Sequence, residues 1–539
     1  MPQIISIPSR ATSSTATRLT TFAGRITRAA PSLSESSVAM ASAFLLIVSF
    51  PDFNLWPLAW IALVPLLFVV ARRAQPGHAF FLGWLFGAVF FYGSCYWLTY
   101  SMIHFGGISP WLAFLLLLPG AVLLGIFPAL FTALLARAVS KWGITALFSA
   151  PFLWPPFEWI RLEATGQLWN ALGYSQAYHA TLIQAASWGG VYAVSFLIML
   201  ANAAIAYALL KRTRKALAIT GAAILLVAVV ILVANKNSQA RESPTDQDSG
   251  ALVIAVQPNV PMDLVKSNED MRKLTVRHFE MSEAALRALP QDGKPRLVIW
   301  PESPMTFAYG SDNQLRGLLA NFAKTNNTSV LLNSQEVAPN DGLFNSAVLI
   351  NQEGSLVAQY DKIRLLPFGE YVPLPEWVPG AGLIRGIVGD FTPGKDYKLM
   401  PVGDARAGVF ICIESAYPSI ARRFTVEGAD VLINISNDGY LGPTAVMRQH
   451  LANAVFRAVE NGRSLLRVTN TGISAFITPR GEVKDATEGF RPEVRTWRIS
   501  RATYPASFYA THGDLFAEGC AVLGLLSFGL SFKKRKQRS

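Results

Sequence analysis

The chain has 539 residues, of which 51% are hydrophobic and only 15% are charged, and its formal net charge is +12. Soluble domains carry about 25% charged residues, so this composition excludes a wholly soluble protein and indicates segments in lipid. The basic residues cluster between apolar segments and at both ends of the chain, which indicates membrane topology and argues against nucleic-acid binding.

Eight apolar segments have a length and composition that suggest membrane helices. They cover residues 37–50, 53–71, 78–103, 109–136, 144–160, 188–210, 216–235 and 515–532. A spanning helix needs about 20 apolar residues. Pro151, Pro155 and Pro156 interrupt the fifth segment, which predicts a kink or a late start there. We therefore predict a membrane domain of about seven helices over residues 37–235 and a last transmembrane helix at 515–532.

Basic residues alternate along these segments. They occur before the first segment, after the second, fourth and sixth, and in residues 533–539, whereas the other connections hold almost none. Lys and Arg favour the cytoplasmic side, so we expect both termini in the cytoplasm and the long region between the last two helices on the outer face. Residues 1–36 are predicted to be a disordered basic cytoplasmic tail, although their Ser, Thr and Arg content also suits an organellar transit peptide. Residues 533–539 form a second basic tail.

Residues 236–250 are polar and predict a linker, and residues 251–514 alternate short strands with helices. The expected strands are 251–257, 297–300, 329–332, 346–350, 356–360, 407–413, 431–436, 464–469 and 474–478. The expected helices are 268–289, 314–324, 415–427 and 444–461. The polar run 351–354 predicts a hairpin. The pattern indicates an α/β layered domain with a mixed sheet.

Three polar residues follow predicted strands of this region, namely Glu302, Lys362 and Cys412. Loops at strand ends are held by a rigid sheet and often carry reactive groups. Cys412 has no disulfide partner nearby, because Cys95 and Cys520 lie in apolar segments. Each residue has an ordinary interpretation alone, as a helix cap, a solvated lysine or an inert buried thiol. Together they suggest a base, a cation and a nucleophile.

The stretches around these residues resemble the nitrilase, or carbon–nitrogen hydrolase, superfamily, which carries a Glu–Lys–Cys triad in this chain order. The matching stretches are 300–303, 360–362, 366–373, 411–414, 434–438, 457–461 and 469–474. With membrane segments on both sides, and a further similar stretch at 169–176, the chain resembles the apolipoprotein N-acyltransferase family.

This resemblance implies a multi-pass α-helical membrane domain plus an αββα nitrilase-like domain over residues 251–514, on the outer face of a bacterial inner membrane. It implies transfer of an acyl chain from a phospholipid to the N-terminal α-amine of the lipid-modified, diacylglyceryl cysteine of apolipoproteins, through a thioester on Cys412. That reaction completes lipoprotein maturation. It needs no metal and no organic cofactor, and its partners are a phospholipid, an apolipoprotein and the membrane, with no nucleic acid.

The resemblance also implies a role for each site residue. Glu302 is the base, Cys412 is the nucleophile, and the Lys362 ammonium and the backbone N–H of Ile413 stabilise the oxyanion. Ile413 stands where many members have Tyr. Glu370 and Glu414 support the site, and an ordinary cap of the following helix is the alternative for Glu414. The apolar loop at residues 374–387 is a candidate lid, with ordinary packing as its alternative.

Two other functions compete with this one. A membrane-tethered amidase or nitrilase would use the same three residues and water on a small C–N substrate. A transporter or scaffold would have an outer domain that has lost its activity. Eight helices exceed what tethering needs, and the triad is intact, so we favour the N-acyltransferase.

Overall fold

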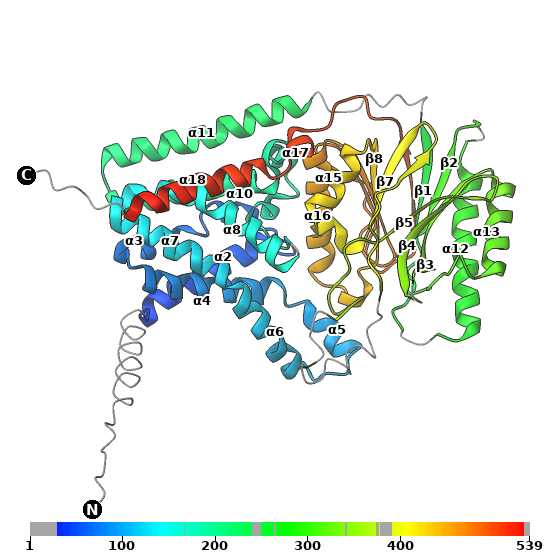
Figure 1. The fold of residues 1–539 in the computed structure, drawn as a ribbon, viewed down its shortest axis with the longest axis horizontal. Helices are drawn as coiled ribbons and strands as arrows, with labels where there is room; N and C mark the ends of the chain where they lie inside the picture. The colour runs from blue at the N-terminus through cyan, green and yellow to red at the C-terminus, as the bar shows by residue number, and fades with distance from the viewer. Residues whose placement is uncertain are drawn as a thin grey trace, which may run out of the picture.

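The computed structural model describes residues 30–166, 168–239, 250–263, 266–290, 292–339, 342–372, 377 and 391–532. A helical part and a sheet-rich part lie next to each other along the long axis of the molecule (Figure 1). Most of the two predicted tails and all of the candidate lid except Trp377 lie outside the described residues.

The helical part is built from the N-terminal helices and the last helix of the chain. Its elements are α2 (Leu33–Ser49), η1 (Trp56–Trp60), α3 (Val64–Arg73), α4 (Pro76–Ser94), α5 (Leu98–His104), α6 (Pro110–Leu124), α7 (Ile126–Trp142), η2 (Ile144–Ser149), α8 (Ala150–Thr165), η3 (Leu172–Gln176), α9 (Ala180–Ile183), α10 (Ala186–Lys211), α11 (Arg214–Gln239) and α18 (Leu515–Phe532). Within the described residues, five helical stretches are long and apolar enough to cross a membrane, and α2 and α18 contain shorter apolar helices.

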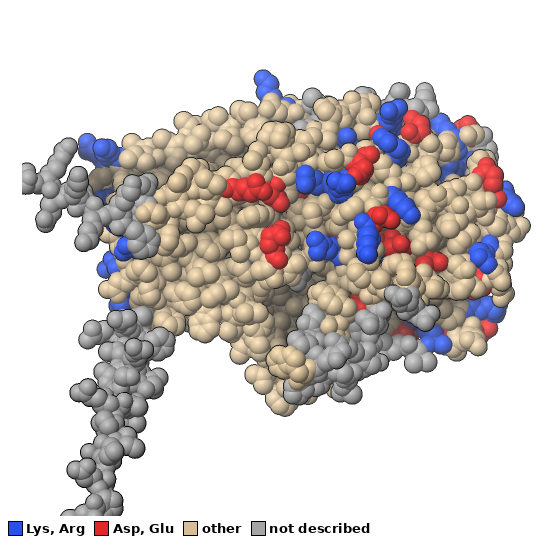
Figure 2. Space-filling view, in the orientation of Figure 1, with Lys and Arg blue, Asp and Glu red and all other residues tan. Residues whose placement is uncertain are grey.

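The surface supports the same division of the molecule. In the view of Figure 2, charged side chains are concentrated over the sheet-rich part, and basic side chains also mark the far end of the helical part. Much of the surface between these zones carries no charged side chain in that view. A charge-poor band of this kind suits contact with lipid.

Several helix bounds differ from the sequence-based expectation, and three of them concern the predicted tail, the prolines and the linker. Helix α2 begins at Leu33, inside the predicted tail, because Ser32 and Glu35 form a capping box in which each side chain accepts from the other's backbone N–H. Helix α8 starts at Ala150 and continues through its internal prolines. Helix α11 extends to Gln239, into the predicted linker, and the linker residues 240–249 lie outside the described part.

The sheet-rich part holds two six-stranded sheets. The first has the order β12-β1-β2-β3-β4-β5 and the second β11-β10-β9-β8-β7-β6. The strands are β1 (Ala251–Gln257), β2 (Arg296–Ile299), β3 (Ser329–Val337), β4 (Leu343–Ile350), β5 (Leu356–Asp361), β6 (Leu399–Val402), β7 (Ala405–Ile411), β8 (Val431–Ser436), β9 (Ser464–Thr469), β10 (Ala475–Ile477), β11 (Val483–Lys484) and β12 (Glu493–Ile499). Both sheets are mixed, since β1-β2-β3 and β7-β8-β9 pair in parallel and the outer strands pair antiparallel. The predicted hairpin joins β4 to β5.

Helices cover the outer faces of both sheets, which gives the αββα layering. Helices α12 (Asn268–Ala288) and α13 (Asn313–Asn326) pack on the first sheet around the buried Trp300. Helices α15 (Pro418–Val426) and α16 (Val446–Asn461) lie on the second sheet, on the side of the helical part (Figure 1). Apolar residues of the second sheet, of α16 and of the helical part belong to one continuous core.

Helix α16 joins the two parts. Nearly every residue of this helix is buried. Its Gln449 amide accepts from the indole N–H groups of Trp97 (3.0 Å) and Trp169 (2.9 Å), and it donates to the carbonyls of Pro51 and Ser94. One side chain of the sheet-rich part therefore satisfies four polar groups of the helical part.

A second polar contact lies at the C-terminal end of α16. The Glu460 carboxylate accepts from the backbone N–H of Val191 at 2.9 Å, where α10 restarts after the non-helical Gly189 and Gly190. Arg457 contacts the same carboxylate at 2.6 Å, and both side chains are fully buried. Burial raises the pKa of Glu460 to about 7, although Arg457 opposes the shift. The joint between the two parts is thus both apolar and polar.

Replacing Gln449 by Leu tests the joint. The substitution leaves two indole N–H groups and two carbonyls without this partner, and each buried unsatisfied group costs about 1–3 kcal/mol. We expect a loss of about 2–5 kcal/mol in the free energy of unfolding, measured by thermal unfolding in detergent. Arg448→Ala is the matched control, because Arg448 is the adjacent residue of the same helix. Its salt bridge with Asp52 is exposed and contributes less than about 1 kcal/mol. Equal stability of the two variants would contradict the assignment.

Candidate active site

Cys412 lies where a buried strand turns sharply into a short helix. Strand β7 ends at Ile411, and Cys412 has a φ of 50°, in the left-handed region that non-glycine residues seldom adopt. The 3-10 helix η5 (Cys412–Ala416) starts at the same residue. The sequence-based expectation of a strand running through Ile413 was therefore wrong by two residues, because the chain turns at the thiol.

Glu414 fixes this turn to the end of β5, a strand of the other sheet. Its fully buried carboxylate accepts from the backbone N–H of Ile411 (2.8 Å) and of Ile363 (2.8 Å), and from the hydroxyl of Tyr360 (2.8 Å). The carboxylate thus ties the end of β7 to the end of β5. These hydrogen bonds hold the turn at Cys412 against the residues at the end of β5.

Lys362 and two carboxylates form the charged centre of the site. The buried Lys362 ammonium lies 2.9 Å from a Glu370 oxygen and 3.5 Å from a Glu302 oxygen. Asn345 donates through its amide nitrogen to the same Glu302 and Glu370 oxygens, at 2.9 and 2.6 Å. Glu370 also accepts from the backbone N–H of Leu366. The structure therefore brings Glu302, which follows β2, and Lys362, which follows β5, next to Asn345 of β4.

The charges of this centre act on the thiol. Burial disfavours a charged Lys362, but Glu302 and Glu370 outweigh this effect and raise the pKa of Lys362, which stays protonated. Burial and the Glu302 charge raise the pKa of the Cys412 thiol, although Lys362 opposes them. The resting Cys412 thiol is therefore neutral, and a thiol in this state requires a base to become a reactive thiolate.

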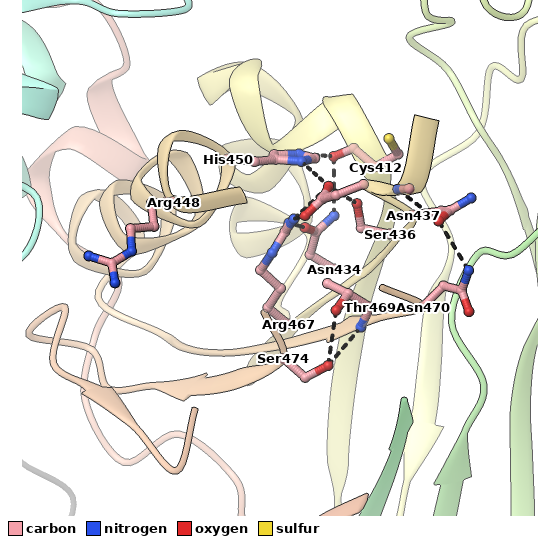
Figure 3. A network of polar contacts seen from close by, with 12 residues as sticks. Cys412, Asn434, Ser436, Asn437, Arg448, His450, Arg467, Thr469, Asn470 and Ser474 are labelled. Atoms are coloured by element: carbon pink, nitrogen blue, oxygen red, sulfur yellow. Dashed lines mark hydrogen bonds and ion pairs between the residues drawn. The ribbon is translucent and has the colours of Figure 1, made fainter. Parts of the chain in front are cut away.

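A buried polar network lies behind Cys412 (Figure 3). The Asp438 carboxylate accepts from Arg467, at 2.9 and 3.1 Å, and contacts Nδ1 of His450 at 2.7 Å. Burial raises the pKa of Asp438, but Arg467 and His450 together hold it well below its usual range. His450 Nε2 lies 3.0 Å from the Cys412 carbonyl oxygen, and Asn434 donates to the same oxygen at 3.4 Å.

The sequence reasoning missed several of these side chains. Asn345 lies inside β4, directly before the predicted strand 346–350, and His450 lies inside a helix, so neither follows the end of a predicted strand. The stretches containing Asn434 and Asp438 were matched as family motifs without a role for either residue. Among the described residues, no group of three or more His, Cys, Asp or Glu side chains could hold a metal ion.

The comparisons with known proteins agree over both parts of the chain. Residues 42–204 match the profile of the apolipoprotein N-acyltransferase N-terminal domain, and residues 253–506 match that of the carbon–nitrogen hydrolase domain. An apolipoprotein N-acyltransferase of Geobacter metallireducens is 32% identical over 507 residues, which cover 92% of this chain and 95% of the relative. One of Azotobacter vinelandii is 31% identical, over 85% of this chain and 87% of the relative.

One similar solved structure is the crystal structure of Saccharomyces cerevisiae Nit3, a member of branch 10 of the nitrilase superfamily. The alignment covers 46% of this chain and 90% of the Nit3 chain, with a TM-score of 0.35 and 18% sequence identity. The sequence matches and the membrane helices define a membrane-bound acyltransferase with a catalytic domain of the carbon–nitrogen hydrolase type. The chain belongs to the apolipoprotein N-acyltransferase family.

Asn345 offers a test of the charged centre. Replacing Asn345 by Leu removes the donor shared by Glu302 and Glu370, so the two carboxylates shift relative to Lys362. Because small displacements of reacting groups cost about 10²-fold in rate, we expect N-acyltransferase activity to fall by about this factor. Asn345→Asp, which keeps the shape but loses the donor, should show a similar loss in a steady-state assay. Full activity of Asn345→Leu would contradict the role.

The raised pKa of Cys412 predicts how its alkylation depends on pH. Below its pKa, the thiolate fraction grows about tenfold per pH unit. We therefore expect the rate of iodoacetamide labelling at Cys412 to keep rising through pH 9, whereas a free cysteine levels off near its pKa of about 8.5. The measurement uses a Cys95→Ser, Cys520→Ser background and mass spectrometry. A plateau below pH 8 would contradict the raised pKa of the Cys412 thiol.

Proposed function

We propose that Cys412, Glu302 and Lys362 transfer an acyl chain from a membrane phospholipid to the N-terminal α-amine of the lipid-modified cysteine of an apolipoprotein. The observation that carries this proposal is the buried Lys362 ammonium held between Glu302 and Glu370, whose charges reach the Cys412 thiol. The membrane helices packed against this domain support a lipid-anchored substrate.

The first half-reaction transfers the acyl chain to the enzyme. Glu302 takes the proton of the Cys412 thiol, and the thiolate attacks the ester carbonyl of the phospholipid. Lys362 and the backbone N–H of Ile413 stabilise the oxyanion that develops on the carbonyl oxygen. The tetrahedral intermediate collapses to a Cys412 thioester. The lysophospholipid leaves as its alcohol after taking the proton back from Glu302.

The second half-reaction transfers the chain to the protein substrate. The α-amine of the lipid-modified cysteine attacks the thioester carbonyl and gives a proton to Glu302. Collapse of this second intermediate forms the amide and expels the Cys412 thiolate, which regains the proton from Glu302. Because Lys362 and Ile413 face the same carbonyl oxygen in both steps, one oxyanion site serves both substrates. Glu370 and Glu414 act only on the position of these groups.

The topology of the chain belongs to the same proposal. We place the protein in a bacterial inner membrane, with both termini in the cytoplasm and residues 251–514 in the periplasm. The membrane domain then covers residues 37–235, the linker 236–250 and the last transmembrane helix 515–532. The alternating basic connections of the sequence support this orientation.

Intact-protein mass spectrometry tests the mechanism. Purified enzyme incubated with a phospholipid of defined acyl chains should gain the mass of one acyl group, and peptide mapping should locate it on Cys412. Adding a diacylglyceryl-cysteine peptide should discharge the adduct and yield the N-acylated peptide. Cys412→Ser should form no thioester, and Glu302→Gln should acylate at least ~10²-fold more slowly because it lacks the base.

Two outcomes would overturn the proposal. One is the absence of a phospholipid-derived adduct on an enzyme that still alkylates at Cys412 with iodoacetamide. The other is release of ammonia from small amides at rates above those of acyl transfer, which would identify an amidase. Cys95→Ser serves as the control variant, because that thiol lies in the helical part, outside the charged centre, and should leave acylation unchanged.

A further inference from the structure

We propose that His450, held by Asp438, is a positioning residue that aims the Ile413 N–H at the substrate oxygen by binding the carbonyl of the same peptide unit. This inference rests on the proposed function, in which that N–H stabilises the oxyanion. It assigns a task to a buried network that the acyl-transfer steps do not otherwise use.

The geometry of one peptide unit carries the inference. The carbonyl of Cys412 and the N–H of Ile413 belong to the same planar unit, in which they point in opposite directions when the peptide is trans. The carbonyl oxygen is held by His450 Nε2 at 3.0 Å and by Asn434 Nδ2 at 3.4 Å. In Figure 3 the carbonyl points to His450, and the sulfur lies on the other side of the backbone. Holding the carbonyl therefore fixes the direction of the N–H.

The backbone at this position needs such a restraint. Cys412 adopts a φ of 50°, which side chains disfavour, so the peptide would relax if its interactions were removed. Asn434 is itself held in place, because Arg467 donates to its side-chain oxygen. Arg467 also donates to Asp438, which contacts His450. His450 and Asn434 thus bind the Cys412 carbonyl directly, and Asp438 and Arg467 hold these two side chains in place.

Asp438 explains why the ring can serve as a donor to the carbonyl. Both ring nitrogens of His450 face acceptors, the Asp438 carboxylate at Nδ1 and the Cys412 carbonyl at Nε2. A neutral imidazole has one N–H, so both bonds together require the protonated ring. The two distances therefore point to an imidazolium held against its Asp438 counter-ion, which opposes the lowering of the His450 pKa by burial and the nearby Arg467. His450 therefore acts as part of a pair.

Two variants of His450 separate a positioning role from a structural one. His450→Leu removes the donor to the Cys412 carbonyl, and His450→Gln retains an amide N–H in its place. We expect His450→Leu to slow acylation of Cys412 by about 10²-fold, the usual cost of an oxyanion donor, with little change in KM. His450→Gln should recover at least about a tenth of the wild-type rate, as partial rescue of that donor. Arg448→Ala, an exposed neighbour on the same helix, should match the wild type.

The rate of alkylation by iodoacetamide at Cys412 separates the two roles, because a structural defect around the thiol would change this rate. Displacement of iodide by the thiolate forms no tetrahedral oxyanion, so the direction of the Ile413 N–H does not affect it. We expect the labelling rates of both His450 variants at Cys412 to stay within about twofold of the wild type. Wild-type acylation by His450→Leu would overturn the inference. An equal loss of alkylation and acylation would also overturn it, by showing that the thiol itself has moved.

A 4-nitrophenyl ester as acyl donor keeps this test independent of the lipid substrate. The ester acylates a cysteine through the same oxyanion and releases a coloured product, whatever the natural donor is. If the wild type reacts with the ester but not with phospholipid, the proposed function fails while the comparison of His450 variants still decides the positioning role. A selective acylation defect of His450→Leu with both donors supports both proposals.

Discussion

The burial of α16 between the second sheet and the membrane helices is the constraint on which the rest of the structure depends. Two adjacent residues of this helix bind polar groups in different parts of the molecule. Gln449 bonds to Trp97 and Trp169 in the helical part, while His450 bonds to the carbonyl of the nucleophile. One turn of helix therefore sets the position of the reactive thiol relative to the membrane helices, and neither part can shift without disturbing the other.

The protonation states of Lys362 and Cys412 depend on the exclusion of water from the site. A buried ammonium is tolerated because two carboxylates surround it, and the half-buried thiol stays neutral because desolvation and a neighbouring carboxylate disfavour its anion. In the proposed mechanism, Lys362 provides a positive charge that is present before the oxyanion forms, so little reorganisation accompanies the reaction.

Much of this architecture was predictable because buried strands read as apolar runs between polar breaks. The bounds of β1, β8 and β9 match the expectation to the residue, and the hairpin between β4 and β5 follows from its turn sequence. The left-handed Cys412 was not predictable, since residue periodicity carries no sign of φ at a non-glycine residue. Asn345 and His450 were missed because a polar side chain inside an element resembles a solvated one until its partners are known. The catalytic roles of Glu302, Lys362 and Cys412 remain predictions.

The burial of α16 also has a consequence for the independence of the catalytic domain. Phe456 packs its ring against Tyr174 of the helical part. Gln449 donates to the Pro51 carbonyl, and Arg457 donates to the Tyr174 hydroxyl. Cut away from the membrane helices, the αββα domain would present an apolar strip interrupted by the Gln449 amide without its partners, whereas Arg457 would keep Glu460 and Ser415. Such a surface favours self-association over solubility. The domain is therefore a layer of a larger fold and not a soluble enzyme attached to an anchor, and its chemistry belongs to the whole chain.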